Sequence, residues 1–176
     1  RAPGQSSLPS FGIFRGIQTA RIKYARNVCG TEQANSSEFD TATPHRIIYK
    51  LRELTGVEEL GGTMRLGAWT CKLVPGSLAS NSYHGATEIS ERHRHRYEFN
   101  REYEPVLTGA GLRIPRPTDA APSAELIELA PAPHPYLLGS PFPPDFQSTP
   151  PAPRPPFPSF PPPPPQNRPT PTPPTP

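Results

Sequence analysis

A short apolar run meets two glycines and then a helical repeat near the start of the chain. The run extends from Phe11 to Phe14, and Gly12 and Gly16 stand on either side of its end. Apolar residues then recur at helical spacing, as Ile17, Ala20, Tyr24 and Val28. A strand that turns sharply into a helix is the unit of α/β folds, so this stretch predicts an α/β protein.

The residue between the two glycines is the one that such a turn presents to solvent. In α/β enzymes this position lies at a helix N-terminus, which stabilises an anion and therefore suits a nucleophile. The position holds Phe14 in this sequence, whose side chain can neither attack nor transfer a proton. The turn therefore has the geometry of a reactive site without a reactive atom.

Composition divides the chain into two parts. From Pro131 onward the sequence carries 22 of its 30 prolines, and beyond Asp145 its charged residues are Arg154 and Arg168. We predict a folded domain over residues 1–146 and a disordered, proline-rich tail over residues 147–176.

Charge, hydropathy and cysteine content exclude several classes. A net charge of +3 is too small to indicate nucleic acid or a membrane as a partner. No apolar run approaches the roughly 18 residues that a membrane helix needs, and we expect no signal peptide. Cys29 and Cys71 lack metal-ligand spacing, which favours two ordinary thiols in a reducing cytoplasm.

Strand and helix patterns alternate along the first part. The predicted strands cover Arg46 to Tyr49, Ala68 to Val74, Ile89 to Phe99, Glu125 to Leu129 and Tyr136 to Ser140. The predicted helices cover Ile17 to Val28, Leu78 to Tyr83 and, after an N-cap at Asn100, a segment to about Ala110 that Pro105 makes less regular.

The strand from Ile89 to Phe99 is unusually charged. Alternation places Arg92, Arg94 and Arg96 on one face and His93 and His95 on the other. Composition alone favours a solvated face or a phosphate contact for the arginines. A metal site at the histidines is less favoured, because no third ligand follows at a recognisable spacing.

Four blocks of the sequence, residues 25–28, 34–40, 61–67 and 91–98, form a recognisable set, with a weaker continuation at 126–129 and 134–136. In these blocks the sequence closely resembles the CTP synthase family, in its C-terminal class I glutamine amidotransferase domain. The resemblance implies a three-layer, flavodoxin-like α/β sheet. We expect it to be partial, because the family's first glutaminase strands and its glycine-rich oxyanion loop have no counterpart in this sequence.

The resemblance also implies a site for glutamine hydrolysis by a Cys-His-Glu triad. The positions of the triad hold Phe14 for the cysteine, Pro143 for the histidine and Asp145 for the glutamate. Positions that bind substrate in the family are represented by Arg15, Gly16, Ile17, Gln18, Glu38 and Arg96. Arg15 replaces a leucine, whereas Gln18, Glu38 and Arg96 match, and Arg96 could pair with a substrate carboxylate.

In the family, the ammonia released from glutamine reaches a synthase domain that uses ATP and magnesium to convert UTP to CTP. We expect no cofactor or metal in this chain and no glutaminase activity, since nucleophile and base are both replaced. We also expect poor solubility unless a partner, such as a complete CTP synthase subunit, completes the sheet.

Three alternatives remain open from the sequence. The chain is an inactive CTP synthase fragment, a non-catalytic module that holds glutamine weakly, or a decayed or misread coding sequence. The tail adds a further binding possibility, because residues 168–174 follow an Arg-x-x-Pro-x-x-Pro pattern that SH3-type grooves recognise.

Overall fold

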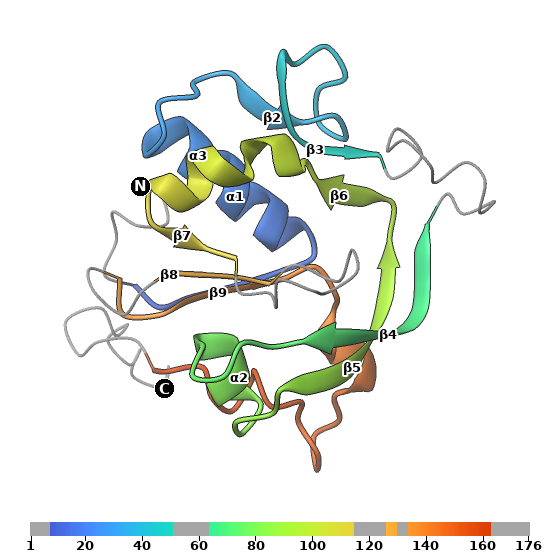
Figure 1. Cartoon of the computed structure of the whole chain (residues 1–176). Helices are drawn as coiled ribbons and strands as arrows, with labels where there is room; N and C mark the ends of the chain where they lie inside the picture. The colour runs from blue at the N-terminus through green and yellow to red at the C-terminus, as the bar shows by residue number, and fades with distance from the viewer. Residues whose placement is uncertain (1–7, 51–63, 115–125, 130–133, 163–176) are drawn as a thin grey trace, which may run out of the picture.

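A four-stranded mixed sheet forms the centre of the molecule in the computed structural model (Figure 1), which describes residues 8–50, 64–114, 126–129 and 134–162. Its strands, in spatial order, are β1 (Ser10–Ile13), β9 (Leu137–Ser140), β8 (Ile127–Leu129) and β7 (Leu112–Arg113). β1 runs parallel to β9, while β9, β8 and β7 pair antiparallel. The sheet thus joins the start of the domain to its end.

Neighbouring residues of β9 face opposite sides of the sheet and feed two separate cores. Leu137 packs with Ile17, Tyr24 and Leu107 on one side. Leu138 packs with Cys71, Tyr83 and Phe142 on the other. Because both faces of β9 are covered, all four of its residues are buried.

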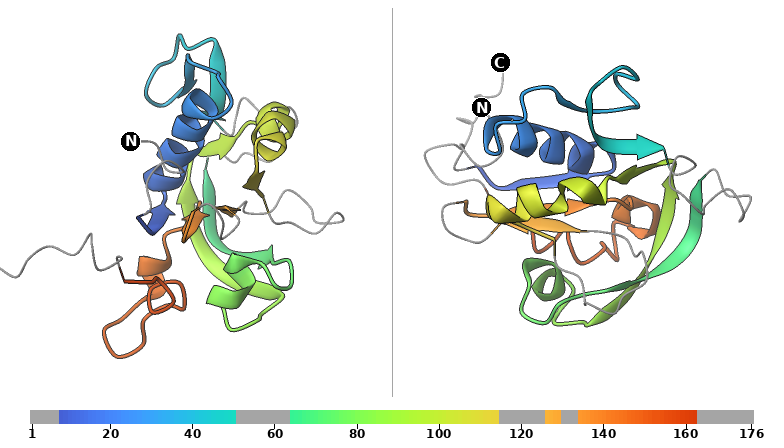
Figure 2. Two further views of the ribbon diagram at one scale, coloured as in Figure 1. Left: turned by 90° about the vertical axis from the view of Figure 1, so that its left-hand side faces the viewer. Right: turned by 45° about the horizontal axis from the view of Figure 1, so that its top comes forward.

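One layer beside the sheet contains α1 (Arg15–Asn27), α3 (Glu104–Gly109) and a small sheet of β2 (Ala34–Ser36), β3 (His45–Lys50) and β6 (Tyr97–Phe99). The other layer contains α2 (Leu78–Ser82) and the hairpin of β4 (Arg65–Lys72) and β5 (Glu88–His95). The right-hand view of Figure 2 shows the two layers on opposite sides of the central sheet. The predicted three-layer α/β fold is confirmed.

The charged segment predicted as one strand from Ile89 to Phe99 is two strands. β5 ends at His95 and β6 begins at Tyr97, so the chain breaks its pairing at Arg96 and moves from the hairpin to the small sheet. The single-strand prediction was wrong because alternation within a segment does not reveal which partner each half pairs with.

The helix predicted after Asn100 begins as a 3-10 turn, η3 (Arg101–Tyr103), and continues as α3. The side chain of Asn100 accepts a hydrogen bond from the backbone N–H of Glu102, as an N-cap does. Pro105 lies at the start of α3, where a proline removes no intrahelical hydrogen bond.

Part of the proline-rich tail contacts the domain. After the 3-10 helix η4 (Pro144–Gln147), the ring of Phe157 lies edge-on to Phe11 and the ring of Phe160 edge-on to Tyr136. Residues 163–176 lie outside the described part. The domain boundary after residue 146 therefore stays a prediction. Within the described ranges, no helix is long and apolar enough to span a membrane.

Candidate functional site

The turn between β1 and α1 has the strained backbone of a nucleophile position. Phe14 adopts φ 53° and ψ −106°, a left-handed conformation that costs a residue with a side chain about 1–3 kcal/mol. Its N–H donates to the carbonyl of Ser140, 3.0 Å away at the end of β9. A Cβ on Gly12 would lie 2.9 Å from the carbonyl carbon of Gly16, so the turn needs glycine there.

The sheet beneath the turn is packed just as closely. A Cβ on Gly139 would lie 2.6 Å from Cγ1 of Ile127 and 2.8 Å from Cγ1 of Ile17. Ile17, predicted as a substrate-binding position, is buried in the core and lines a small cavity beside Phe14. Its side chain therefore supports the turn from below.

A small cavity lies beside Phe14 and is walled by α1, β6 and the end of β9. Its volume is about 20 Å³, close to the space that one water molecule requires. Gln18 lines it and is buried, with its side-chain oxygen 3.5 Å from the hydroxyl of Ser36. The cavity is too small for a glutamine side chain.

Arg15, the residue after Phe14, forms an ion pair with Glu38. The Arg15 guanidinium donates to Oε1 of Glu38 over 2.6 Å, and the Arg15 side chain is 65% exposed. The guanidinium also lies 6.0 Å from the ring centre of Phe39. Glu38, which the sequence assigned to substrate binding, is therefore already paired with a cation of the chain itself.

Arg96 lies on the exposed link between β5 and β6. Its neighbours His95 and Tyr97 line the small cavity, whereas Arg96 does not. The structure thus places Gln18 against the cavity and leaves Arg96 outside it.

The two remaining triad positions lie after β9. Pro143 is buried, and Asp145 is exposed on η4. Pro141, two residues before Pro143, lines the cavity together with Phe14. The segment after β9 therefore returns to the turn, as a catalytic segment would. However, Pro143 offers no base, and Asp145 has no imidazole to orient.

A buried chain of polar side chains extends from the cavity into the second core. Nδ1 of His93 lies 2.9 Å from Nε2 of His95, and Nε2 of His93 lies 3.8 Å from Sγ of Cys71. On its other side, Nδ1 of His95 lies 3.1 Å from the carbonyl of Tyr97. Burial lowers the pKa of His93 to about 3 and raises that of Cys71 to about 12.

The side chains of Cys71, His93 and His95 lie in a row, so their donor atoms do not converge on one point. No cluster of three or more metal-binding side chains occurs within the described ranges. Because the Cys71 thiol is buried and protonated at neutral pH, it also does not replace the missing nucleophile.

A second polar cluster surrounds Glu91, which is 1% exposed. The Tyr83 hydroxyl donates to Oε1 of Glu91 over 2.9 Å, and Nε of Arg154 donates to the same oxygen over 3.1 Å. Burial and the Glu91 carboxylate raise the pKa of Tyr83. The cluster attaches the proline-rich segment to the hairpin.

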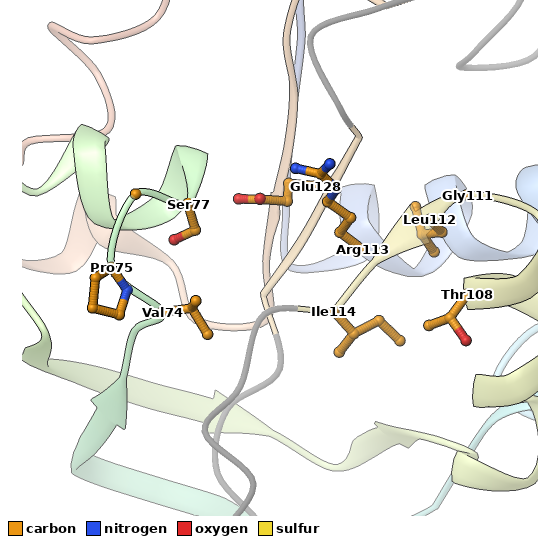
Figure 3. Close-up of a pocket in the computed structure, with 10 residues that line it drawn as sticks. Val74, Pro75, Ser77, Thr108, Gly111, Leu112, Arg113, Ile114 and Glu128 are labelled. Carbon is orange, nitrogen blue, oxygen red and sulfur yellow. The ribbon is translucent and has the colours of Figure 1, made fainter.

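A larger cavity of about 660 Å³ lies away from the turn, between α2 and β7 (Figure 3). Among the described residues that line it, Glu128 is the buried ionisable group, and its carboxylate accepts a hydrogen bond from the backbone N–H of Ala79 over 3.1 Å. Burial raises the pKa of Glu128. Because this carboxylate caps α2, it is a structural group. The two hydroxyls of the described wall also serve the helices, since Ser77 accepts the backbone N–H of Ser80 and Thr108 donates to the carbonyl of Glu104.

Sequence reasoning located the turn and the cavity-lining Gln18, but it missed two contacts. The Arg15–Glu38 pair joins residues 23 positions apart, and the Arg154–Glu91 pair joins residues 63 positions apart. A substitution of leucine by arginine next to a turn was the one available signal for the first pair. No local pattern indicated the second.

Comparison with known proteins identifies the relatives of this chain. It is 65% identical to a CTP synthase of Acidobacterium capsulatum and 61% identical to one of Koribacter versatilis, each over 153 residues, or 87% of the chain. The structure superposes on the glutaminase domain of Trypanosoma brucei CTPS with bound acivicin, with a TM-score of 0.75 and 36% identity. No protein-family model matches.

The matches cover only part of each relative. The chain spans 27% of the length of the two bacterial enzymes and 58% of the trypanosomal glutaminase chain, while 86% of this chain takes part in the structural match. The similarity therefore concerns the glutaminase portion.

Proposed function

We propose that this chain, a homologue of the glutaminase portion of CTP synthases, keeps the scaffold of a glutamine-hydrolysing domain without its chemistry. In a complete enzyme of this family, such a domain releases ammonia from glutamine for the amination of UTP. The chain itself neither holds glutamine firmly nor hydrolyses it.

The observation that carries the proposal is the residue at the turn. Phe14 has the strained backbone that an exposed nucleophile needs, yet it presents a phenyl ring. Acyl transfer requires a nucleophile and a base that activates it. Pro143 stands where the resemblance expects the base, and a proline cannot accept a proton. Strain without a reactive group is what remains when a catalytic residue is replaced and its scaffold is retained.

The surroundings of the turn also argue against substrate binding. Free glutamine carries an ammonium group, a carboxylate and a side-chain amide, and each needs a partner when it leaves water. Glu38 is paired with Arg15, and the space beside Gln18 admits about one water molecule. Binding would require breaking the ion pair and moving Phe14.

A glutamine titration by calorimetry tests this proposal against its closest rival. We expect no heat of binding up to millimolar glutamine, with glutamate as a matched control. A saturable heat with glutamine and none with glutamate would instead favour a non-catalytic glutamine-binding module.

The biological setting of the chain follows from the same homology. We propose that it works in the cytoplasm and that its natural partner is a complete CTP synthase subunit. Co-expression with such a subunit, followed by size-exclusion chromatography, tests the association. Recovery of the chain only as a separate species would contradict it. The SH3-type motif at residues 168–174 lies outside the described residues and remains a sequence prediction.

A further inference from the structure

The outer face of the β4–β5 hairpin carries a groove that the glutaminase scaffold does not explain. The hairpin follows the right-hand and lower edge of the molecule in Figure 1, with η4 next to β5. The groove has a volume of about 350 Å³ and is lined by Leu66, Arg92, His93, Arg94 and Phe146. It is separate from the cavity beside Phe14.

The walls of this groove combine two apolar side chains with two cations. Leu66 is 62% exposed and Phe146 is 53% exposed, which is unusual for two side chains of this size on one groove. Arg92 and Arg94 are exposed, and neither side chain makes a hydrogen bond or ion pair with another of the described residues. No acidic side chain among the described residues lines the groove.

The positions of these groups follow from strand geometry. Leu66 pairs with Arg94 and Ala68 with Arg92, so the two arginines and Leu66 share one face of the hairpin. Arginines two residues apart on a strand are separated by about 6.8 Å. Carboxylates at alternate positions of an extended peptide have the same spacing, so the groove matches an extended acidic segment in both charge and period.

We propose that this groove binds an extended segment of a protein partner in which two acidic residues occupy alternate positions and an aliphatic residue follows two positions later, so that all three side chains share one face of the segment. The acidic side chains pair with Arg92 and Arg94, since guanidinium groups bind carboxylates through two parallel hydrogen bonds. The aliphatic side chain lies on the same face of the segment as the two acidic side chains, and it covers the exposed surfaces of Leu66 and Phe146.

A nucleic acid is the less suitable occupant. Single-stranded nucleic acids bind through several stacked aromatic rings along a basic groove. Phe146 is the single aromatic side chain among the apolar walls of this groove, and the whole chain carries a net charge of only +3.

Fluorescence anisotropy with synthetic peptides tests the proposal on the full chain. The probe, the alternating peptide, is a labelled nine-residue peptide with glutamate at two alternate positions, leucine at the next position on the same face and serine elsewhere. The controls are a peptide with glutamine in place of glutamate, a peptide with its glutamates in one block, and a single-stranded oligonucleotide. We expect binding of the alternating peptide that weakens as salt is raised, and at least tenfold weaker binding of each control.

Protein variants locate the binding on the surface. The double variant R92E/R94E should weaken the alternating peptide at least tenfold, and L66S should weaken it several-fold. The matched control K23E reverses an exposed charge on α1 and should leave binding unchanged. Circular dichroism verifies that each variant is folded, and F146S provides an independent apolar variant if L66S unfolds.

Several outcomes would overturn the proposal. They are no peptide binding up to 1 mM, equal binding of the alternating and block peptides, tighter binding of the oligonucleotide, or an equal loss in K23E and R92E/R94E. None of these results depends on whether the chain hydrolyses glutamine.

Discussion

The guanidinium of Arg154 donates to the buried carboxylate of Glu91, joining the proline-rich segment to the centre of the β4–β5 hairpin. Glu91 is 1% exposed, and the hydroxyl of Tyr83 is its other partner. A buried carboxylate needs a partner because it has lost its hydration. This contact therefore explains how a segment so rich in proline is held against the domain.

Removing one partner of the Arg154–Glu91 ion pair should lower the free energy of unfolding more than replacing both partners. We expect R154M to lower the free energy of unfolding by about 1–3 kcal/mol, because it leaves the Glu91 carboxylate without its cation. The double variant E91Q/R154M should recover a large part of this loss. Urea unfolding of the wild-type protein, R154M, E91Q and E91Q/R154M measures these values, and additive effects of the two substitutions would contradict the coupling.

The two thiols should differ in reactivity. Cys71 is fully buried and its pKa is raised to about 12, whereas Cys29 is partly exposed at the end of α1. We expect a thiol reagent at pH 8 to modify Cys29 in the native protein and Cys71 only after unfolding. Titration of free thiols with and without denaturant measures this, with C29S as the control. Rapid modification of Cys71 in native C29S would show that the reagent reaches the core formed by Cys71, Leu138 and Phe142.

The buried histidine pair should make stability depend on pH. Burial lowers the folded-state pKa values of His93 and His95 below their ordinary value near 6.5. The unfolded state therefore binds protons first, so the contribution is complete above pH 6.5 and is lost as the pH falls toward 3. The slope is at most about 1.4 kcal/mol per pH unit for each histidine.

Urea unfolding between pH 7 and 5 measures this slope before most carboxylates titrate. The variant H93Q removes one of the two groups and should flatten the dependence. An unchanged slope in H93Q would show that other groups cause it.

The close packing of Gly139 under the turn predicts that one added methyl group there strongly lowers the stability of the fold. A Cβ at position 139 would overlap Ile17 and Ile127, so G139A should lower the free energy of unfolding by about 1–3 kcal/mol. The matched control is G109A, since a Cβ there meets nothing within 4 Å and alanine favours a helix. Denaturant midpoints give the comparison, and equal stability of the two variants would contradict the described packing.

Patterns of local sequence predicted the framework of this fold well. The apolar run ending at Phe14 and the helical repeat after it correspond to β1 and α1. The alternation placed the arginines and the histidines on opposite faces of the strand, and the structure has Arg92 and Arg94 exposed with His93 and His95 buried. Such patterns succeed because burial imposes a period on the chain.

The features that the sequence did not reveal depend on distant partners. β2 (Ala34–Ser36) is short and polar, and no strand was predicted there, because its strand conformation comes from pairing with β3. The break at Arg96 separates two strands that pair with different neighbours. The ion pair between Arg15 and Glu38 takes up a carboxylate that substrate binding would need. It connects two segments whose proximity is set only by the fold.

The most direct test of the central claim is an assay of glutamate release by the purified chain incubated with glutamine. A catalytically complete glutaminase serves as the positive control, and F14A, which removes the phenyl ring, serves as the matched variant. The account predicts no glutamate above the uncatalysed background for either protein, because no side chain at the turn can attack the amide. Glutamine-dependent release by the wild-type chain that a thiol-blocking reagent abolishes would contradict it.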